Sequence, residues 1–501
     1  MRALKIPTDI KARIRTLTIS AGILLFIVLS LSSCGISLRS SLPDPDSHSA
    51  KHGISETQIE PAERSNPMKR RHDTPDEHGG KKMFRRSSPS IPDKPSRPTV
   101  APGHEVFTDH IRNTREGADE WIKLYNDTYG DGSASGTIMT HSEIADMNRR
   151  MTEECHGMRD MASVPETISG DELLHMIRKY ELPHSDFYTS DHTLIDGAIR
   201  SKILENRNLD QIKDTVELRR AIIVKRCNIK SFPTDIGFYK YKDLEHCYYD
   251  NIQETELIVG FPVAVASESL DGQFLFVISY YYSGWIPADA AAYCSNDIFE
   301  KFVRPELYVT IVEKKADCGN HAELLDMGTV LPYVSEDFDS YTVLLPTRLD
   351  DGSLELTDEK VSKSDAVFGS LEFTQANFIN QAFAFIGSDY DWGGGRGGVD
   401  CSGFTCAVFR SFGIYLPRNA GQQRDFAGNV TQFNEESNIS GALDSAKYPT
   451  SVYRPGHVML YLGKKDGEYY IIHAPQGGEQ VTTAALPLWN LTGISSFSAE
   501  Q

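Results

Sequence analysis

The stretch "DWGGGRGGVDCSGFTC", residues 391–406, places five glycines within six positions and then a cysteine directly after an acid. Beyond Cys401, the apolar residues Phe404, Val408 and Phe412 recur every four positions. This spacing predicts an amphipathic helix with Cys401 in its first turn. A helix N-terminus carries partial positive charge, so we expect the pKa of Cys401 to lie below the free-thiol value of about 8.5. The cysteine is therefore a candidate nucleophile.

The glycines before this helix favour a loop that passes close beneath a substrate and then turns sharply. Gly393, Gly395 and Gly398 also satisfy the spacing G-x-G-x-x-G of dinucleotide-binding loops. No apolar strand precedes them, and the acid that would bind a ribose is missing. We therefore expect no nucleotide and no other cofactor.

A second segment, "RPGHVMLYLGKKDGEYYIIHAP" (454–475), contains two histidines in a β-like pattern. A symmetric hairpin centred on Lys465 would place His457 directly opposite His473, with Cβ atoms about 5 Å apart. A cysteine nucleophile needs a base, and the base needs a group that orients it. The spacing thus predicts a nucleophile, a base and an orienting residue.

Three segments together resemble the NlpC/P60 family of cell-wall cysteine peptidases, whose fold is papain-like: residues 390–423, "GHVMLYLG" (456–463) and "IIHAP" (471–475). The resemblance implies that Cys401 is the nucleophile, His457 the base and His473 the third polar residue. It also implies that five further residues line or brace the groove: Tyr390, Trp392, Asp400, Ser402 and Arg418.

Residues 259–289 resemble the bacterial SH3 domains of one multidomain branch of this family. The resemblance implies hydrolysis of peptidoglycan stem peptides between γ-D-glutamate and the diamino acid, with a preference for a free N-terminal L-alanine. Asp400 is expected to bind that ammonium group, and Tyr282 is a candidate substrate contact. The branch commonly has an acid before the proline of "GFPV", where this chain has Phe261.

The pattern along the chain predicts an α+β protein in several parts. Residues 106–205 have helical spacing, with Ser169 before Glu172 as a capping box. Short β runs predict a first SH3 domain at 206–295, with a hairpin turn at Asp271-Gly272, and a second at 296–360. The two are expected to be small β-barrels that precede a papain-like catalytic domain at 365–501.

The N-terminal 34 residues read as a secretory signal, because their apolar core is shorter than the roughly 20 residues that a bilayer needs. The ending "LSSC" resembles a bacterial lipobox, which implies that Cys34 is lipidated, although an uncleaved anchor is an alternative. Gly35 in place of Asp implies the outer membrane, facing the periplasm. Residues 35–105, rich in proline and serine, are expected to be a disordered tether.

The charge and the cysteine pattern of the chain argue against two classes of binding partner, nucleic acids and metal ions. Residues 106–501 carry 34 basic against 59 acidic residues, which disfavours nucleic acid as a partner. The seven cysteines after Cys34 show no zinc-site spacing, so no metal is expected, and Cys406 fits a helix core. We expect a monomeric thiol peptidase acting on peptidoglycan. The alternatives are cleavage of intact sacculus, a thiol acyltransferase and a non-enzymatic wall-binding lipoprotein.

Overall fold

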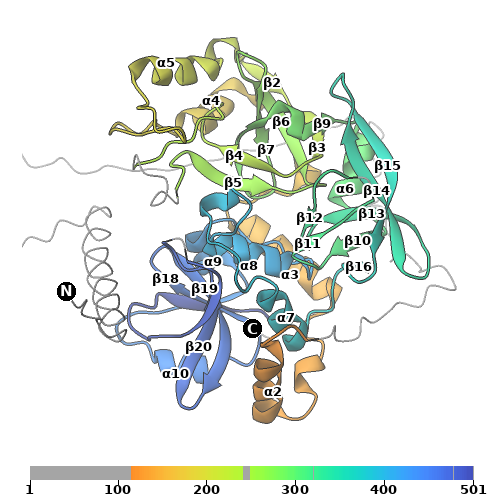
Figure 1. Cartoon of the computed structure of the whole chain (residues 1–501), viewed down its shortest axis with the longest axis vertical. Helices are drawn as coiled ribbons and strands as arrows, with labels where there is room; N and C mark the ends of the chain where they lie inside the picture. The colour runs from red at the N-terminus through yellow and green to blue at the C-terminus, as the bar shows by residue number, and fades with distance from the viewer. Residues whose placement is uncertain (1–113, 241–248, 320, 478, 500–501) are drawn as a thin grey trace, which may run out of the picture. The chain divides into compact units, whose positions relative to one another are not determined.

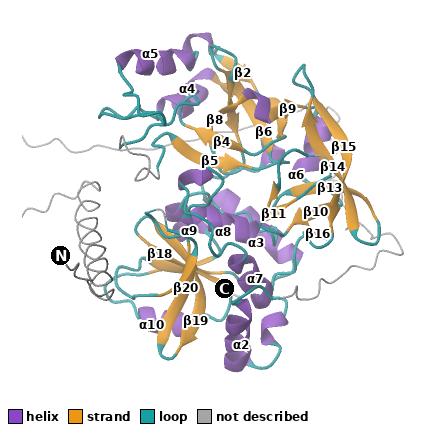
Figure 2. Cartoon of the chain, viewed as in Figure 1, coloured by secondary structure: helices purple, strands orange, loops and turns teal. Residues whose placement is uncertain are grey.

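The computed structural model of the chain describes residues 114–240, 249–319, 321–477 and 479–499. These residues belong to one compact unit and form helices, two antiparallel sheets and a mixed C-terminal part in that order (Figures 1 and 2). The α+β expectation is confirmed. The expected signal, Cys34 and the tether lie outside the described residues. Among the residues described, no helix is long and apolar enough to cross a bilayer.

The first described part is helical, as expected. Its main helices are α2 (Ala118–Tyr129), α3 (His141–Glu154), α4 (Gly170–Arg178) and α5 (Gly197–Asn206). A full capping box at Thr140 and Glu143 starts α3. At α4 the Ser169 hydroxyl accepts a hydrogen bond from the Glu172 amide at 3.1 Å. The short strands β1 (Thr167–Ser169) and β2 (Thr215–Glu217) then pair and join this part to the first sheet.

The first β region is a seven-stranded sheet in the order β5-β4-β8-β7-β6-β3-β9. Its strands are β3 (Arg219–Ile223), β4 (Cys227–Lys230), β5 (Gln253–Leu257), β6 (Pro262–Glu268), β7 (Phe274–Ile278), β8 (Ser283–Pro287) and β9 (Ala291–Tyr293). The hairpin expected at Asp271-Gly272 joins β6 to β7, and Gly272 has the positive φ of 71° that such a turn requires.

Helix α6 (Asn296–Val303), which the pattern did not predict, leads into the second β region. This region is a five-stranded sheet in the order β15-β14-β13-β10-β16, with a separate two-stranded pair of β11 and β12. The strands are β10 (Tyr308–Ile311), β11 (Lys315–Ala316), β12 (Leu325–Asp326), β13 (Val330–Glu336), β14 (Ser340–Arg348), β15 (Leu354–Ser362) and β16 (Ala366–Phe368). Strand β16 pairs with β10, so this sheet continues past residue 360.

The C-terminal part packs helices against a six-stranded antiparallel sheet in the order β17-β22-β18-β19-β20-β21. Its helices are α7 (Gln375–Phe383), the 3₁₀ turn η6 (Trp392–Gly394), α8 (Cys401–Arg410), α9 (Ala420–Phe426) and α10 (Ile439–Asp444). Its strands are β17 (Asn429–Gln432), β18 (Thr450–Arg454), β19 (His457–Lys465), β20 (Glu468–His473), β21 (Thr482–Ala485) and β22 (Gly493–Ser496). Helix α8 lies against β19, as the figures also show.

One hydrophobic core joins the helical part to the C-terminal part. Phe404 and Val408 of α8 are fully buried in it, which confirms the predicted apolar face, and Phe412, just beyond the end of the helix, is buried in it too. The same core contains Trp121 of α2 and Met151 of α3. The two helices therefore complete the core against which α8, the helix that begins with the candidate nucleophile, packs.

Candidate active site

Cys401 is the first residue of α8, as the sequence predicted, and only 5% of its surface is exposed. Asp400 caps the helix, and one of its carboxylate oxygens accepts a hydrogen bond of 2.6 Å from the Gly403 amide. The cysteine side chain packs against Tyr453 of β18 and Val458 of β19. Val458 follows His457 directly in the chain, so the start of α8 lies against the strand that also carries the candidate base.

The prediction of a low pKa for the Cys401 thiol is wrong, because the surroundings of the thiol raise its pKa. Burial raises the pKa of Cys401 to about 12, and the negative charge of Asp400 adds to this effect. A helix N-terminus supplies only about half a charge, whereas taking a thiolate out of water is costly. In this structure the cysteine is therefore a neutral thiol that needs a base at the moment of attack.

His457 and His473 are brought together, with 2.9 Å between Nε2 of His457 and Nδ1 of His473. Burial lowers the pKa of His457 to about 4, and the neighbouring His473 adds to the shift. Burial also lowers the pKa of His473 to about 4, with a contribution from Arg454. Both rings are therefore neutral near pH 7. Nδ1 of His457 is buried and has no hydrogen-bond partner among the described residues.

The hairpin that carries the two histidines differs from the symmetric one expected. Its turn is Asp466-Gly467, and the pairing of Lys465 with Glu468 excludes a centre at Lys465. A β-bulge at Leu462 inserts one extra residue into β19. In the register beyond the bulge, Leu460 pairs with Ile472, so His457 and His473 are diagonal and not directly opposite. The inserted residue returns both side chains to the same face of the sheet.

Asp400, Ser402 and Arg418 form a closed, buried network. The guanidinium of Arg418 donates to both oxygens of Asp400, at 3.1 and 2.8 Å, and to the Ser402 hydroxyl at 2.8 Å. Burial alone would raise the pKa of Asp400, but Arg418 and two backbone amides hold it below its usual value. Because its oxygens are already engaged, Asp400 is better placed to brace the helix start than to bind a substrate ammonium. A contact between Asp400 and a substrate ammonium stays a prediction.

The glycine-rich loop passes beneath a protein strand, where a substrate was expected. The φ values of Gly393 and Gly394 are +60° and +67°. A Cβ at Gly393 would lie 2.9 Å from Cγ of Gln253 and 3.2 Å from the backbone of Glu254, both on β5. Gln253 donates from Nε2 to the Gly393 carbonyl at 3.1 Å. The glycines thus let the catalytic loop pack closely on the first β region.

Tyr390 and Trp392 lie on this loop. Both pack against Tyr249, which comes from the first β region. Trp392 is 38% exposed and donates from its indole nitrogen to the Gln253 carbonyl at 3.0 Å. The Tyr249 ring packs edge-on against Trp392 at 5.2 Å and against Tyr390 at 6.4 Å. Burial raises the pKa of Tyr249, although its hydrogen bond with Tyr390 opposes the shift.

Tyr282 points to an acid that the sequence analysis missed. Its hydroxyl donates a hydrogen bond to Oε2 of Glu254 on β5. Burial raises the pKa of Glu254 above its usual range, and the described residues hold no cation within ion-pair distance of it, although Lys179 contributes a favourable charge. The sequence signal for this site is the pair of acids inside the strand "QETEL" (253–257). In an ordinary barrel strand, polar residues would alternate with apolar ones that face the core.

Phe261, which stands where the branch commonly has an acid, is a core residue. It is 7% exposed and its ring packs edge-on against Tyr280 at 5.5 Å and Tyr281 at 6.2 Å. Cys406 is also buried, as expected for a helix core. Within the described ranges, no group of three or more His, Cys, Asp or Glu side chains is arranged to hold a metal ion.

Comparison with known proteins gives two family matches. The model of the NlpC/P60 family matches residues 387–491, and the model of the SH3 domain of SH3b1 type matches residues 238–287. The first match contains all three of the predicted Cys and His residues. The second contains Glu254, Tyr249 and Tyr282.

Among curated proteins, the chain is 31% identical over 216 residues to a gamma-D-glutamyl-L-lysine dipeptidyl-peptidase of Bacillus cereus. That match covers 40% of this chain and 58% of the relative. The protein of the same name from Bacillus subtilis is 28% identical over 253 residues, covering 47% of this chain and 77% of the relative. The solved structure of an NlpC/P60 endopeptidase from Photobacterium damselae subsp. piscicida shares the fold, with a TM-score of 0.59 over 78% of this chain and 99% of that one, at 18% identity.

Proposed function

Since this chain carries an NlpC/P60 domain at residues 387–491 behind an SH3 domain at residues 238–287, we propose that it is a cysteine peptidase of peptidoglycan stem peptides. The bond cleaved is that between γ-D-glutamate and the diamino acid. The observation that carries the proposal is the His457–His473 pair at 2.9 Å, with Nδ1 of His457 left without a partner among the described residues, beside the strand that contacts Cys401.

The reaction follows from these protonation states. We assign the tautomer in which Nε2–H of His457 donates to Nδ1 of His473, because it leaves Nδ1 of His457 unprotonated and able to act as a base. This nitrogen takes the thiol proton as Sγ attacks the γ-carbonyl of D-glutamate. The resulting imidazolium gives the proton to the departing amine of the diamino acid. Water, deprotonated by the same nitrogen, then hydrolyses the thioester and regenerates the thiol.

Glu254 supports a preference for stems with a free N-terminal L-alanine. A partly buried carboxylate without a cationic partner is disfavoured in its charged form, and an incoming ammonium would reverse that penalty. The glycine-rich loop packs on β5 next to Glu254: Trp392 donates to the Gln253 carbonyl, and Gly393 approaches the Glu254 backbone. The proposed ammonium site is therefore made by Glu254 of the first β region. Asp400 is already bonded to Arg418.

The proposal is tested with the purified chain and the tripeptide L-Ala-γ-D-Glu-L-Lys, analysed by mass spectrometry. We expect L-Ala-D-Glu and free lysine as products. Cys401→Ala is expected to lower kcat by at least about 10³-fold with unchanged circular dichroism, because members of a catalytic unit typically contribute that much. Cys406→Ala is the matched control and is expected to keep the rate. Cleavage that survives in Cys401→Ala would rule out Cys401 as the nucleophile, and no cleavage by the native chain would favour a wall-binding protein.

A further inference from the structure

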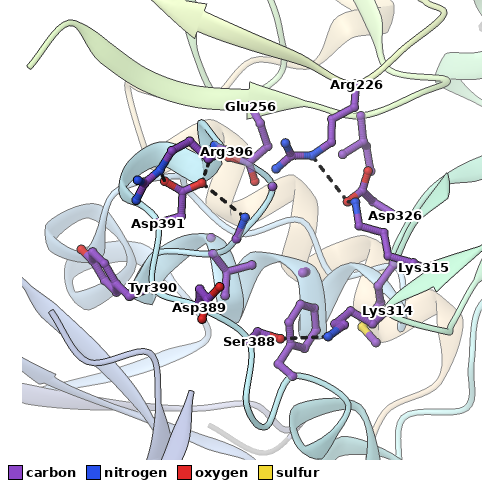
Figure 3. Close-up of a pocket in the computed structure, with 18 of the residues that line it drawn as sticks. Arg226, Glu256, Lys314, Lys315, Asp326, Ser388, Asp389, Tyr390, Asp391 and Arg396 are labelled. Carbon is purple, nitrogen blue, oxygen red and sulfur yellow. Dashed lines mark hydrogen bonds and ion pairs between the residues drawn. The ribbon is translucent and has the colours of Figure 1, made fainter. Parts of the chain in front are cut away.

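A cavity of about 620 Å³ lies behind the catalytic loop and is separate from the residues of the proposed reaction (Figure 3). Its wall comes from the first β region, the second β region, the loop at residues 387–399 and the side of α8 that carries Gly403, Ala407 and Arg410. Neither Cys401 nor the two histidines line it. The volume falls within the range of roughly 300–1,000 Å³ that is usual for small-molecule sites.

The wall of this cavity is rich in cations although the chain as a whole has a net charge of −19. Five basic residues line it: Arg226, Lys314, Lys315, Arg396 and Arg410. The labelled side chains converge on the cavity from several elements (Figure 3). A concentration of positive charge on an anionic protein favours an anionic ligand at that place.

The acids of the wall are already engaged by protein groups. Asp326 pairs with Lys315 at 2.6 Å and with Arg226 at 3.5 Å, and Asp391 pairs with Arg396 at 3.3 Å. Glu256 lies 3.7 Å from Arg418, and Asp389 accepts from Gln480 at 3.0 Å. These four carboxylates therefore leave part of the positive charge of the wall uncompensated.

Two of the cations have no carboxylate within ion-pair distance among the described residues. Lys314 donates to the Ser388 hydroxyl at 3.1 Å, as Figure 3 shows. Arg410 is only 3% exposed, and its Nε has no hydrogen-bond partner in the described part of the chain. Arg410 ends α8, whose C-terminus offers about half a negative charge. Burial alone would lower the pKa of Arg410, but the nearby Tyr280, Tyr281, Cys406 and Glu256 hold it above its usual value, so the guanidinium is charged and able to attract an anion.

We propose that this cavity binds a small anion carrying carboxylate or phosphate groups, and that Lys314 and Arg410 are its principal contacts. The guanidinium of Arg410 presents donors in a fork that matches either kind of anion, and Lys314 adds a point charge from the second β region. The lining of this cavity includes Tyr390 but neither Cys401 nor the two histidines. The proposed anion site does not depend on the proposed peptidase activity, because binding is measured without hydrolysis.

The test titrates the full chain with inorganic phosphate in one series and with succinate in another, at constant ionic strength set with sodium chloride, and measures heat of binding. We expect saturable binding in at least one series. Lys314→Gln is expected to weaken it about tenfold, which is the effect of removing one charged hydrogen bond. Lys301→Gln, which changes an exposed lysine on α6 away from the cavity, is the matched control and should bind as the native chain does.

The Cys401→Ala variant separates this cavity from the catalytic groove, and it is expected to bind the anion with unchanged affinity. The conservative Arg410→Lys variant is expected to weaken binding while keeping the circular dichroism spectrum. Which series saturates at lower concentration identifies the chemistry as phosphate or carboxylate. No saturable heat in either series, or equal affinity in Lys314→Gln and Lys301→Gln, would overturn the proposal.

Discussion

At the scale of single residues, burial decides the charge state of the reactive groups. Cys401 lies at a helix N-terminus, yet its pKa rises to about 12 because it is buried and next to Asp400. The pKa of His457 falls to about 4 for the same reason of burial. The resting site therefore holds a neutral thiol and a neutral imidazole. The ion pair forms only as the substrate is attacked.

This charge state predicts an unusual pH profile. Because the pKa of His457 is lowered, its imidazole remains an unprotonated base until the pH approaches about 4, whereas an ordinary histidine would be half protonated near 6.5. We expect kcat/KM for the N-acetyl tripeptide, which has no ammonium group for Glu254 to bind, to stay level from pH 7 to about 5 and to fall as the pH approaches 4. The profile is measured with circular dichroism at each pH to exclude unfolding. A fall centred near pH 6.5 would contradict the buried, neutral base.

At the scale of elements, the sequence pattern predicted the helix and the hairpin but not the register of the hairpin. The four-residue recurrence of Phe404, Val408 and Phe412 identifies α8, since helix periodicity is local. The bulge at Leu462 is invisible to alternation, because a bulge changes the register without changing residue types. Likewise, glycines predict a close approach but not its partner. Here the partner is β5, about 140 residues earlier, and only tertiary structure brings the two together.

The contact between the loop and β5 predicts the effect of adding one methyl group. In Gly393→Ala the new Cβ would meet the β5 backbone at 3.2 Å, and the positive φ adds strain. We expect a loss of about 2 to 4 kcal/mol in the free energy of unfolding in urea, the sum of overpacking and φ strain.

Gly397→Ala is the matched control, because Gly397 also has a positive φ, of +95°, but nothing lies within 4 Å of its Cβ position. This variant is expected to lose only the strain of about 1 to 2 kcal/mol. An equal loss of unfolding free energy in the two variants would show that glycine is not required at position 393 for close packing on β5.

At the scale of the whole molecule, the helical part is not an independent unit. Its helices were predicted from local spacing, but their role could not be, since the core they complete is formed by residues more than 200 positions later. Trp121 is 6% exposed in the same core as Phe409, and its ring lies 5.3 Å from that of Tyr470. The catalytic part therefore depends on α2 and α3 for its stability.

This dependence predicts that a substitution in the helical part destabilises the catalytic part. We expect Trp121→Ala to cost about 3 to 5 kcal/mol in the free energy of unfolding, as for other buried aromatic residues. In the measurement, unfolding in urea is monitored through the loss of tripeptide hydrolysis. The control is Trp489→Ala in the catalytic part, where the ring is 67% exposed and its removal is expected to cost little. A Trp121→Ala chain that unfolds at the same urea concentration as the Trp489→Ala chain would contradict the shared core.

We propose that the glycine-rich loop and the first β region together bind stem peptides with a free N-terminus. The measurement compares kcat/KM for L-Ala-γ-D-Glu-L-Lys and its N-acetyl form in the native chain and in Glu254→Gln, with exposed Glu436→Gln as the control. A charged hydrogen bond in a partly buried site is worth about 1.5 to 3 kcal/mol, so the native chain should favour the free amine by roughly ten- to a hundredfold. Glu254→Gln should remove most of this preference by slowing only the free-amine peptide. Equal rates for the two peptides in the native chain would contradict the claim and favour cleavage of the intact sacculus.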